Sequence, residues 1–203
     1  MFKKGSNPHH PKIGQSTRTE PIRNKHDIAE IKSYLAGRPR ELLLFTLGIN
    51  TAWRVNDLLS TTVEELRYLS PISLEWVKKE SKTGKIRRVT ANRVILETLR
   101  EVSKKGLFDG KDDKSLVFTG LRGTITQPTV TTWVKEWTDA IGLRGDFGGR
   151  SLRQTWVYHC IKDNTADIAT LMQMLGHSSQ LITLRYACIQ PEDHKKVYLA
   201  TEL

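Results

Sequence analysis

The chain has 203 residues, a length that allows one sizeable hydrophobic core with small additions. Its formal charge of +10 indicates a polyanionic partner, most simply nucleic acid. Two cysteines, Cys160 and Cys188, are too few for a disulfide framework and lack metal-ligand spacing. No apolar run approaches the ~18 residues of a membrane span, and no secretory signal is visible. These properties exclude a disulfide-rich secreted protein and a helical membrane protein, and they predict a soluble protein of the cytoplasm.

The first 22 residues predict a flexible basic arm, because basic residues and prolines follow one another there with almost no apolar periodicity. His9 and His10 lie in this arm and are interpreted as solvated side chains rather than metal ligands. Residues 23–203 are predicted to form a single domain.

Helices are predicted to open this domain. Apolar residues recur at helical spacing from Asp27 to Leu35, with Asp27 as a plausible N-cap. A second helix over 39–50 is apolar nearly all round and should be buried. A short helix over 55–60 and one turn over 62–66 follow.

The pattern changes to β over residues 73–90. Two strands, one around Trp76 and one over 86–90, flank a Ser-Lys-Thr-Gly turn and predict an antiparallel hairpin. The hairpin is strongly basic, as expected of a surface that binds phosphate. Its candidate DNA-binding residues are Lys78, Lys79, Lys85, Arg87 and Arg88.

The rest of the sequence reads mainly as helix. Helices are expected over 93–105, 129–141, 152–162, 165–174 and 180–187, with a short strand at 116–118 in the loop before residue 127. A last amphipathic helix is expected to start at Pro191, a residue suited to a first helical turn, and to reach about Thr201.

The C-terminal third places two arginines, a histidine and a tyrosine at a distinctive spacing. Arg-Ser-Leu-Arg ends at Arg153, Leu-Gly-His-Ser-Ser contains His177, and Tyr186 follows nine residues after that histidine. Arginine pairs bind phosphate bidentately through their planar guanidinium groups. A tyrosine close to such a pair can act as a nucleophile. The pattern suggests attack on a phosphodiester.

The arrangement resembles the tyrosine recombinase (phage integrase) family, whose second box reads His-x-x-Arg, then Leu-Gly-His-Ser, then Tyr. In this chain, Thr-Ala-Trp-Arg54-Val-Asn-Asp57-Leu resembles the first box of the family. Lys82, in a Lys-Thr-Gly turn, matches the lysine of the family's β-hairpin. One departure is plain, because Arg150 stands where the family has its first histidine. Arginine stays protonated and cannot act as a base, so Arg150 is either a third cation at the phosphate or a surface residue.

The resemblance implies an α+β, mainly helical catalytic domain with a small antiparallel β-sheet packed on one side. It covers about residues 25–200 and leaves no room for the N-terminal core-binding domain that the family usually carries. The chain is therefore read as a domain fragment or a short variant. No metal and no cofactor are expected, because arginines and a lysine supply the positive field at the phosphate.

The resemblance also assigns roles to the candidate catalytic residues, which are Arg54, Lys82, Arg150, Arg153, His177 and Tyr186. The arginines at 54 and 153 would clamp the phosphate, with Asp57 orienting an arginine or capping a helix. The lysine at 82 is the candidate general acid, with Lys85 as its nearest rival. The histidine, at a helix junction, would hydrogen bond to a non-bridging oxygen.

Tyr186 is the candidate nucleophile, and its rivals are Tyr158, expected in the core, and Tyr198, expected to pack in the last helix. Its attack would form a 3′-phosphotyrosine and free a 5′ hydroxyl, which would then attack the linkage on a partner duplex. The implied function is site-specific DNA recombination or integration. A catalytically impaired DNA-binding relative and a type IB-like topoisomerase are the alternatives, and a helix-turn-helix regulator is a third from another class.

The expected partner is double-stranded DNA. The family acts as a homotetramer in a synaptic complex, whereas the free chain is expected to be a monomer because its charge opposes self-association. The segment 191–203 is predicted to pack on a neighbouring subunit in that complex. Accessory DNA-bending proteins are a further expected class of partner, and no membrane is expected to take part.

Overall fold

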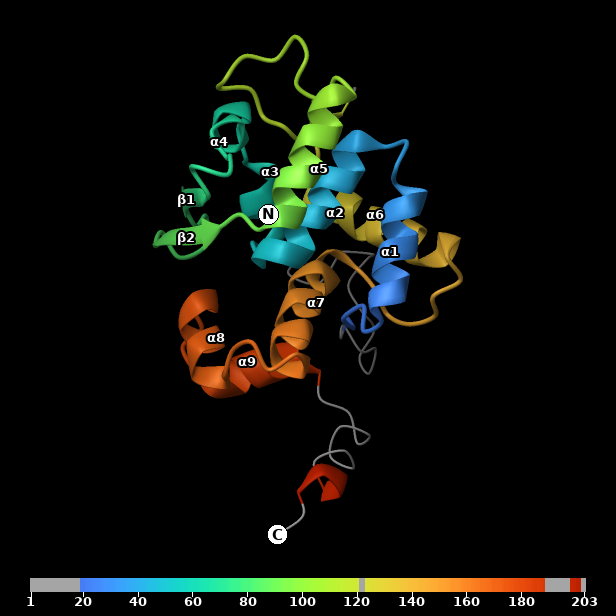
Figure 1. Ribbon diagram of the computed structural model, residues 1–203, viewed down its shortest axis with the longest axis vertical. Coiled ribbons are helices and arrows are strands. Elements are labelled where there is room, and N and C mark those ends of the chain that lie inside the picture. Colours follow the sequence, from blue (N-terminus) through green and yellow to red (C-terminus); the bar gives the residue numbers. More distant parts are fainter. Residues whose placement is uncertain (1–18, 121–122, 189–197, 202–203) are drawn as a thin grey trace, which may run out of the picture.

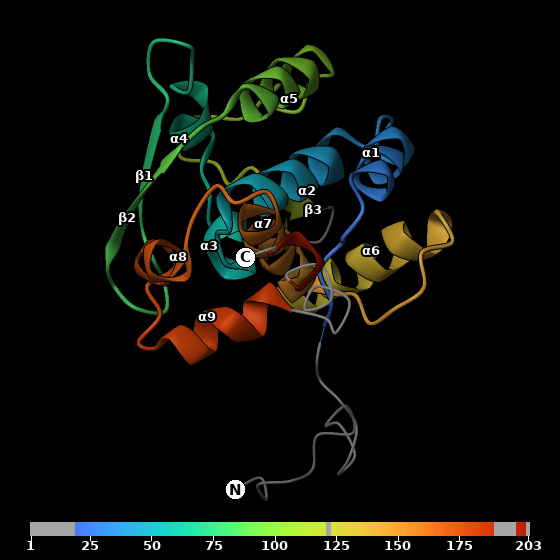
Figure 2. The ribbon, with the colours of Figure 1, turned by 60° about the horizontal axis from the view of Figure 1, so that its bottom comes forward.

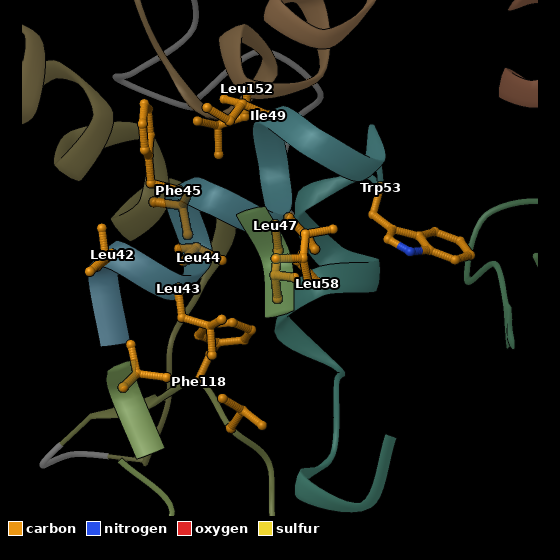
Figure 3. Close-up of a cluster of buried hydrophobic side chains, with 14 of the residues drawn as sticks. Leu42, Leu43, Leu44, Phe45, Leu47, Ile49, Trp53, Leu58, Phe118 and Leu152 are labelled. Atoms are coloured by element: carbon orange, nitrogen blue, oxygen red, sulfur yellow. The ribbon is translucent and has the colours of Figure 1, made fainter. Parts of the chain in front are cut away.

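The computed structural model describes residues 19–120, 123–188 and 198–201 of the chain. Its central element is α2 (Pro39–Thr51), whose side chains are buried on nearly every face, as predicted. Figure 3 shows its apolar residues gathered with Leu58, Phe118 and Leu152 of other elements. α5 (Arg93–Lys104) and α7 (Gly149–Lys162) pack against it. An added Cβ at Gly48 would lie 2.9 Å from Cβ of Leu152, so glycine permits the close approach of α2 and α7.

α1 (Lys25–Tyr34) and α6 (Gln127–Ala140) pack together on one side of α2 (Figure 1). The first helix starts earlier than predicted, because Asn24 and not Asp27 is its N-cap. The Asn24 side chain accepts a hydrogen bond from the backbone N of His26 and satisfies a donor that the helix leaves unpaired. Asp27 then lies in the first turn, where a negative charge suits the helix dipole.

The predicted hairpin is confirmed, with β1 (Glu75–Lys79) antiparallel to β2 (Ile86–Thr90) and Trp76 opposite Val89. It follows the short helices α3 (Val55–Leu59) and α4 (Val63–Arg67). The hairpin stands at one side of the molecule, near α3 and α8, in both views (Figures 1 and 2). Its anchor is Trp76, which is buried against Trp53 with ring centroids 5.7 Å apart. Figure 3 shows that Trp53 points away from the other labelled core residues.

The prediction of a short strand at 116–118 is wrong. Leu116 makes a single β-bridge to Thr62, and the second small hairpin consists of β3 (Thr119–Gly120) and β4 (Gly123–Thr124). The side chains at 117 and 118 are instead fully buried in the main core, where they hold the loop against α2.

The C-terminal helices are α7, α8 (Ile168–Leu175) and α9 (Gln180–Ala187). α9 has the predicted bounds, whereas α7 begins at Gly149 rather than at residue 152. An added Cβ at Gly149 would lie 3.1 Å from the Val55 side chain. A glycine at the first position of α7 therefore permits the close approach of α7 and α3. α8 begins three residues later than predicted, since the Asp167 side chain caps it at Thr170. The three helices lie together (Figure 1), and apolar residues of α7 and α8 form a smaller second core with Ala52.

The boundary of the predicted arm at residue 22 is also wrong. Ile22 is fully buried, and its backbone N donates to Thr155 on α7. Thr19 donates to the side chain of Gln154 on the same helix, so residues 19–22 belong to the folded domain. The rest of the arm, with His9 and His10, lies outside the described residues.

Most of the helix expected over 191–201 also lies outside the described residues, which include only its end. There residues 198–200 are helical, as predicted, but Tyr198 is 83% exposed, so the packing expected of its side chain is absent from the described residues. No helix in the described ranges is long and apolar enough to cross a membrane.

Candidate active site

A cleft of about 520 Å³ opens where the α2–α3 turn, the tip of the β1–β2 hairpin, the N-termini of α6 and α7, and α9 meet. Its lining includes five of the six predicted catalytic residues, namely Arg54, Lys82, Arg150, Arg153 and Tyr186. The sixth, His177, contacts two of these residues from behind the lining. The structure therefore brings together residues that are spread over more than 130 positions of the sequence.

Arg54 stands just before the first turn of α3 and is held by two buried carboxylates. Its Nη1 lies 2.7 Å from Oε1 of Glu80 and 3.9 Å from Oδ2 of Asp57. Burial acts to raise the pKa of Glu80, but a hydrogen bond from Thr83 and the charge of Arg54 outweigh it and lower that pKa. The carboxylate thus stays ionised and fixes the arginine.

Asp57 joins the first box to the hairpin. Its Oδ1 accepts hydrogen bonds from both the backbone N and the hydroxyl of Ser81, at 2.8 and 2.6 Å. The predicted contact with Arg54 is present, and the same carboxylate also holds the turn that carries Lys82 at the cleft. Lys85, the rival of Lys82, is exposed and lies outside the cleft lining.

Arg153 is 3% exposed and ties α7 to two other segments. Its Nη1 donates to the carbonyl oxygen of Ala52 at 2.6 Å, and its Nη2 donates to that of Leu175 at 2.9 Å. Burial, and then the nearby charges of Arg54 and Arg87, lower the pKa of Arg153 to about 10, so it remains protonated at neutral pH. An anionic phosphate in the cleft would relieve the repulsion among these cations.

His177 lies at the predicted helix junction, after Gly176 in left-handed conformation at the end of α8. Its Nε2 is 3.4 Å from Nη2 of Arg153, and its Nδ1 is 3.0 Å from the Thr183 hydroxyl. Because arginine only donates, Nε2 must accept, which leaves Nδ1 to carry the proton of a neutral ring. Burial and the charges of Arg153 and Arg54 lower the pKa of His177 to about 4, in agreement with that tautomer.

Tyr186 presents its ring to three of these residues. The guanidinium carbons of Arg150 and Arg153 lie 5.6 and 5.7 Å from the ring centroid, and the His177 ring lies 5.2 Å away. Of the two rivals, Tyr158 is buried as predicted, and neither it nor Tyr198 lines the cleft. Arg150 is solvent-exposed yet borders the cleft, so its charge is available to a ligand there.

The basic residues of the hairpin fall into two groups. Lys78 and Arg87 are engaged within the protein, the lysine with Glu65 and the arginine with backbone carbonyls. The other three candidates, Lys79, Lys85 and Arg88, are exposed, and the last of them pairs with Glu75 on the neighbouring strand. Of these five candidates, the exposed three present their charge to solvent.

Two residues that support the site, Glu80 and Thr183, were not predicted from the sequence. Glu80 is one of two acids among the many basic residues of the hairpin, and an acid in that setting is the signal that could have marked its ion pair with Arg54. Thr183 gives no comparable signal, because its hydroxyl meets His177 only once α8 and α9 are folded together. Among the described residues, no group of three His, Cys, Asp or Glu side chains could hold a metal ion.

The stability of the folded chain is expected to fall as the pH is lowered from about 6.5, the pKa of an unfolded histidine, towards the folded value of about 4 for His177. Between these values the unfolded state binds the extra proton, so this contribution to stability is complete above pH ~6.5 and is lost on acidification. Chemical denaturation at neutral pH and at about pH 5 measures it. His177→Asn should lose less stability between the two pH values than the wild type, and an equal loss would contradict a neutral His177.

Comparison with known proteins agrees with this geometry. A model of the phage integrase family matches residues 24–193. The chain belongs to the phage integrase family. A probable integrase/recombinase, YoeC of Bacillus subtilis strain 168, is 33% identical over 181 residues, which cover 88% of this chain and 94% of that protein. Members of the family cleave and rejoin DNA through a 3′-phosphotyrosine, so the family and function inferred from the sequence are confirmed.

Solved structures of recombinases share the fold. The crystal structure of XerA recombinase has a TM-score of 0.74 at 16% identity and matches 92% of this chain and 65% of its own. XerH bound to a palindromic difH substrate, in a post-cleavage complex, has a TM-score of 0.71 at 21% identity over 90% of this chain and 53% of its own. The predicted mainly helical α+β fold with a small antiparallel sheet is confirmed. This chain spans about half the length of that XerH chain.

Proposed function

We propose that this chain cleaves and rejoins duplex DNA with Tyr186 as its nucleophile, assisted by Arg54, Lys82, Arg153 and His177. One observation carries the proposal. The Tyr186 ring lies within 6 Å of two guanidinium groups and an imidazole at the edge of a cleft that also holds Arg54 and Lys82. A tyrosine that served only for packing would not need such a concentration of positive charge around it.

In the proposed reaction the Tyr186 oxygen attacks phosphorus and gives its proton to water in the open cleft, and the bond from phosphorus to the 5′ oxygen breaks. Arg54 and Arg153 stabilise the negative charge that develops on the phosphate, because their positions are fixed before DNA arrives. Lys82 is suited to give a proton to the leaving 5′ oxygen. The freed 5′ hydroxyl reverses these steps on the same or another duplex, with no net change in the number of phosphodiester bonds.

His177 takes part as a neutral ring whose Nε2 accepts rather than donates. A phosphate entering the cleft would raise its pKa, because it introduces negative charge beside the ring. The imidazole is then ready to take up a proton and donate a hydrogen bond to a non-bridging oxygen, which is the role that the family resemblance implies.

Duplex DNA is the proposed partner, in keeping with the net charge of +10 and with the XerH structure bound to its difH substrate. A homotetramer on two duplexes, a monomeric free chain and accessory DNA-bending proteins remain part of this proposal. A helix-turn-helix regulator would explain the charge but not the cleft, so we do not retain it.

Arg150→His is expected to keep or raise cleavage activity. Arg150 borders the cleft, and a histidine there restores the residue type that the family carries at this position. Its imidazole can both donate and accept a proton, which arginine cannot. Single-turnover cleavage by the two proteins measures the effect. A marked loss of activity would show that the arginine makes a contact of its own with the DNA.

Covalent trapping tests the proposed function without knowledge of the target site. The protein is mixed with a pool of random duplexes that carry a nick, so that a short fragment 3′ to the cleavage diffuses away and prevents rejoining. Adducts that survive detergent are isolated, and sequencing of the attached strands identifies the cleaved site. An adduct through the 3′ phosphate is expected. Non-covalent binding without any adduct would identify the chain as a catalytically impaired relative.

A further inference from the structure

Arg87 lies behind the cleft rather than in it. It is partly buried on β2, and it is absent from the cleft lining. It borders a separate hollow on the other side of the hairpin, together with Trp156 and Gln173. Burial lowers the pKa of Arg87 to about 10, so it remains charged at neutral pH. This cation thus does not line the cleft, although it belongs to the basic hairpin.

The Arg87 side chain instead closes the end of α2. Its Nη2 donates to the carbonyl oxygen of Thr51 at 2.6 Å, and its Nη1 donates to that of Ala52 at 3.1 Å. Its guanidinium carbon also lies 4.6 Å from the centroid of the Trp53 ring, within the range of a cation–π contact. The last carbonyls of a helix have no partner in the helix itself, and here one planar side chain pairs two of them.

The carbonyl oxygen of Ala52 is shared by two arginines from distant parts of the chain. Arg153 on α7 donates to it at 2.6 Å, and Arg87 on β2 donates to it at 3.1 Å. Ala52 itself has a φ of +50°, a left-handed conformation that is strained for a residue with a Cβ. Such a conformation persists only where its surroundings hold it in place. Here the two guanidinium groups bind its carbonyl, and its methyl group is packed in the second core with Val157 and Leu171.

We infer that Arg87 is a positioning residue for DNA cleavage, which acts by holding the Thr51–Ala52 backbone so that Arg54 and Arg153 meet the same phosphate. Arg54 is only two residues beyond Ala52, and Arg153 uses the Ala52 carbonyl as its own anchor. Release of this backbone would therefore shift both arginines at once. The inference rests on the proposed function, since it concerns the same cleft.

The hairpin thereby fixes the first box from both of its strands. Trp76 on β1 packs on Trp53, and Arg87 on β2 stacks on the same ring and binds the carbonyls before it. Lysine cannot replace this arginine, because a single ammonium group lacks the planar pair of donors that spans two carbonyls. Arg87→Lys therefore keeps the charge and removes the positioning, which makes it the informative variant.

The test compares Arg87→Lys with Arg93→Lys in the full chain, on the nicked duplex selected by covalent trapping. Arg93 begins α5, where it is solvent-exposed and pairs with Glu97 at 2.8 Å, well apart from the cleft lining. Affinity for the uncleaved duplex and the single-turnover rate at saturating DNA are measured separately, at temperatures well below each unfolding midpoint. For Arg87→Lys we expect cleavage to be slower by about 10- to 100-fold, the scale of a small misplacement of reacting groups, with affinity within about twofold of wild type. Arg93→Lys should match the wild type in both.

Three results would overturn the inference. Arg87 would be a DNA contact if Arg87→Lys binds DNA more weakly but cleaves at the wild-type rate at saturation. The salt dependence of its DNA affinity should then be reduced by about one phosphate contact. A lower unfolding midpoint with a wild-type rate in the folded protein would make its role purely structural. A wild-type rate and midpoint would show that the two hydrogen bonds are dispensable. If the wild-type chain itself forms no adduct on any duplex, the proposed function fails rather than the positioning role.

Discussion

Tyr186→Phe is expected to abolish covalent attachment to DNA while folding and non-covalent binding stay close to wild type. The substitution removes only the hydroxyl group, which is the nucleophile in the proposed reaction. The phenyl ring keeps its place near Arg150, Arg153 and His177, so the contacts that orient α9 remain. The unfolding free energy should change by less than about 1 kcal/mol, as is usual when no buried partner is lost. Detergent-resistant adducts on the selected nicked duplex and the affinity for that duplex are the two measurements.

Two other tyrosines provide matched controls for this variant. Tyr158→Phe changes a buried ring outside the cleft lining, and Tyr198→Phe changes one that is 83% exposed. Both variants should form adducts as the wild type does. Adducts that persist in Tyr186→Phe and disappear in Tyr198→Phe would move the nucleophile to Tyr198. Their loss in Tyr158→Phe alone would point to damage to the core, which thermal unfolding would reveal.

The parts of this site that the sequence predicts are those with strong local signals. The Lys-Thr-Gly turn needs a residue that tolerates positive φ, and Gly84 adopts a φ of +68° between the two strands of the predicted hairpin. α9 has the predicted bounds because Ser179 and Cys188 flank a continuous helical pattern. The end of α8 also has a local signal in the sequence, because Gly176 adopts the left-handed conformation that commonly ends helices. Each of these features is decided by neighbouring residues.

The parts that could not be predicted depend on contacts between distant segments. In sequence, Arg87 is one basic residue among several on the hairpin, and only the folded chain places its guanidinium on carbonyls 35 and 36 positions away. Ala52 carries no mark of its left-handed backbone, which glycine or asparagine would have suggested. The helix predicted from residue 152 in fact includes Gly149, whose lack of a side chain permits the contact with Val55. The secondary-structure propensities of the residues indicate where helices and strands form, whereas tertiary contacts decide which basic side chain faces the cleft.

The cations of the site therefore differ in how firmly they are held. Arg54 is fixed by Glu80, and Arg153 by two carbonyls, whereas Lys82 and Arg150 are exposed at the cleft. A fixed donor stabilises developing charge without reorganisation during the reaction. An exposed lysine can instead move to follow a leaving group. This difference in mobility matches the proposed roles, with the arginines as the clamp and Lys82 as the acid.

Arg153→Ala is expected to slow cleavage by at least about 10²-fold, the scale for removing one preorganised donor from a developing charge. The carbonyl and histidine contacts use three of the five N–H donors of its guanidinium, and its Nε is buried without a hydrogen-bond partner in the described structure. The remaining donors are the ones available to a phosphate. The same substitution should also lower the unfolding free energy by about 1–3 kcal/mol, because the Leu175 carbonyl loses its side-chain donor, whereas the Ala52 carbonyl keeps its hydrogen bond from Arg87.

Two further variants separate the catalytic effect of Arg153 from its effect on stability. Arg153→Lys keeps the charge and can reach only one carbonyl, so it should recover part of the stability but little of the cleavage rate, since the planar donor pair is gone. Arg100→Ala, at an exposed position on α5 away from the cleft, should change neither quantity. Rates are compared at saturating DNA and at temperatures where every variant is folded. If Arg153→Ala then cleaves at the wild-type rate, its guanidinium only joins α7 to the ends of α2 and α8, and Arg54 must hold the phosphate without it.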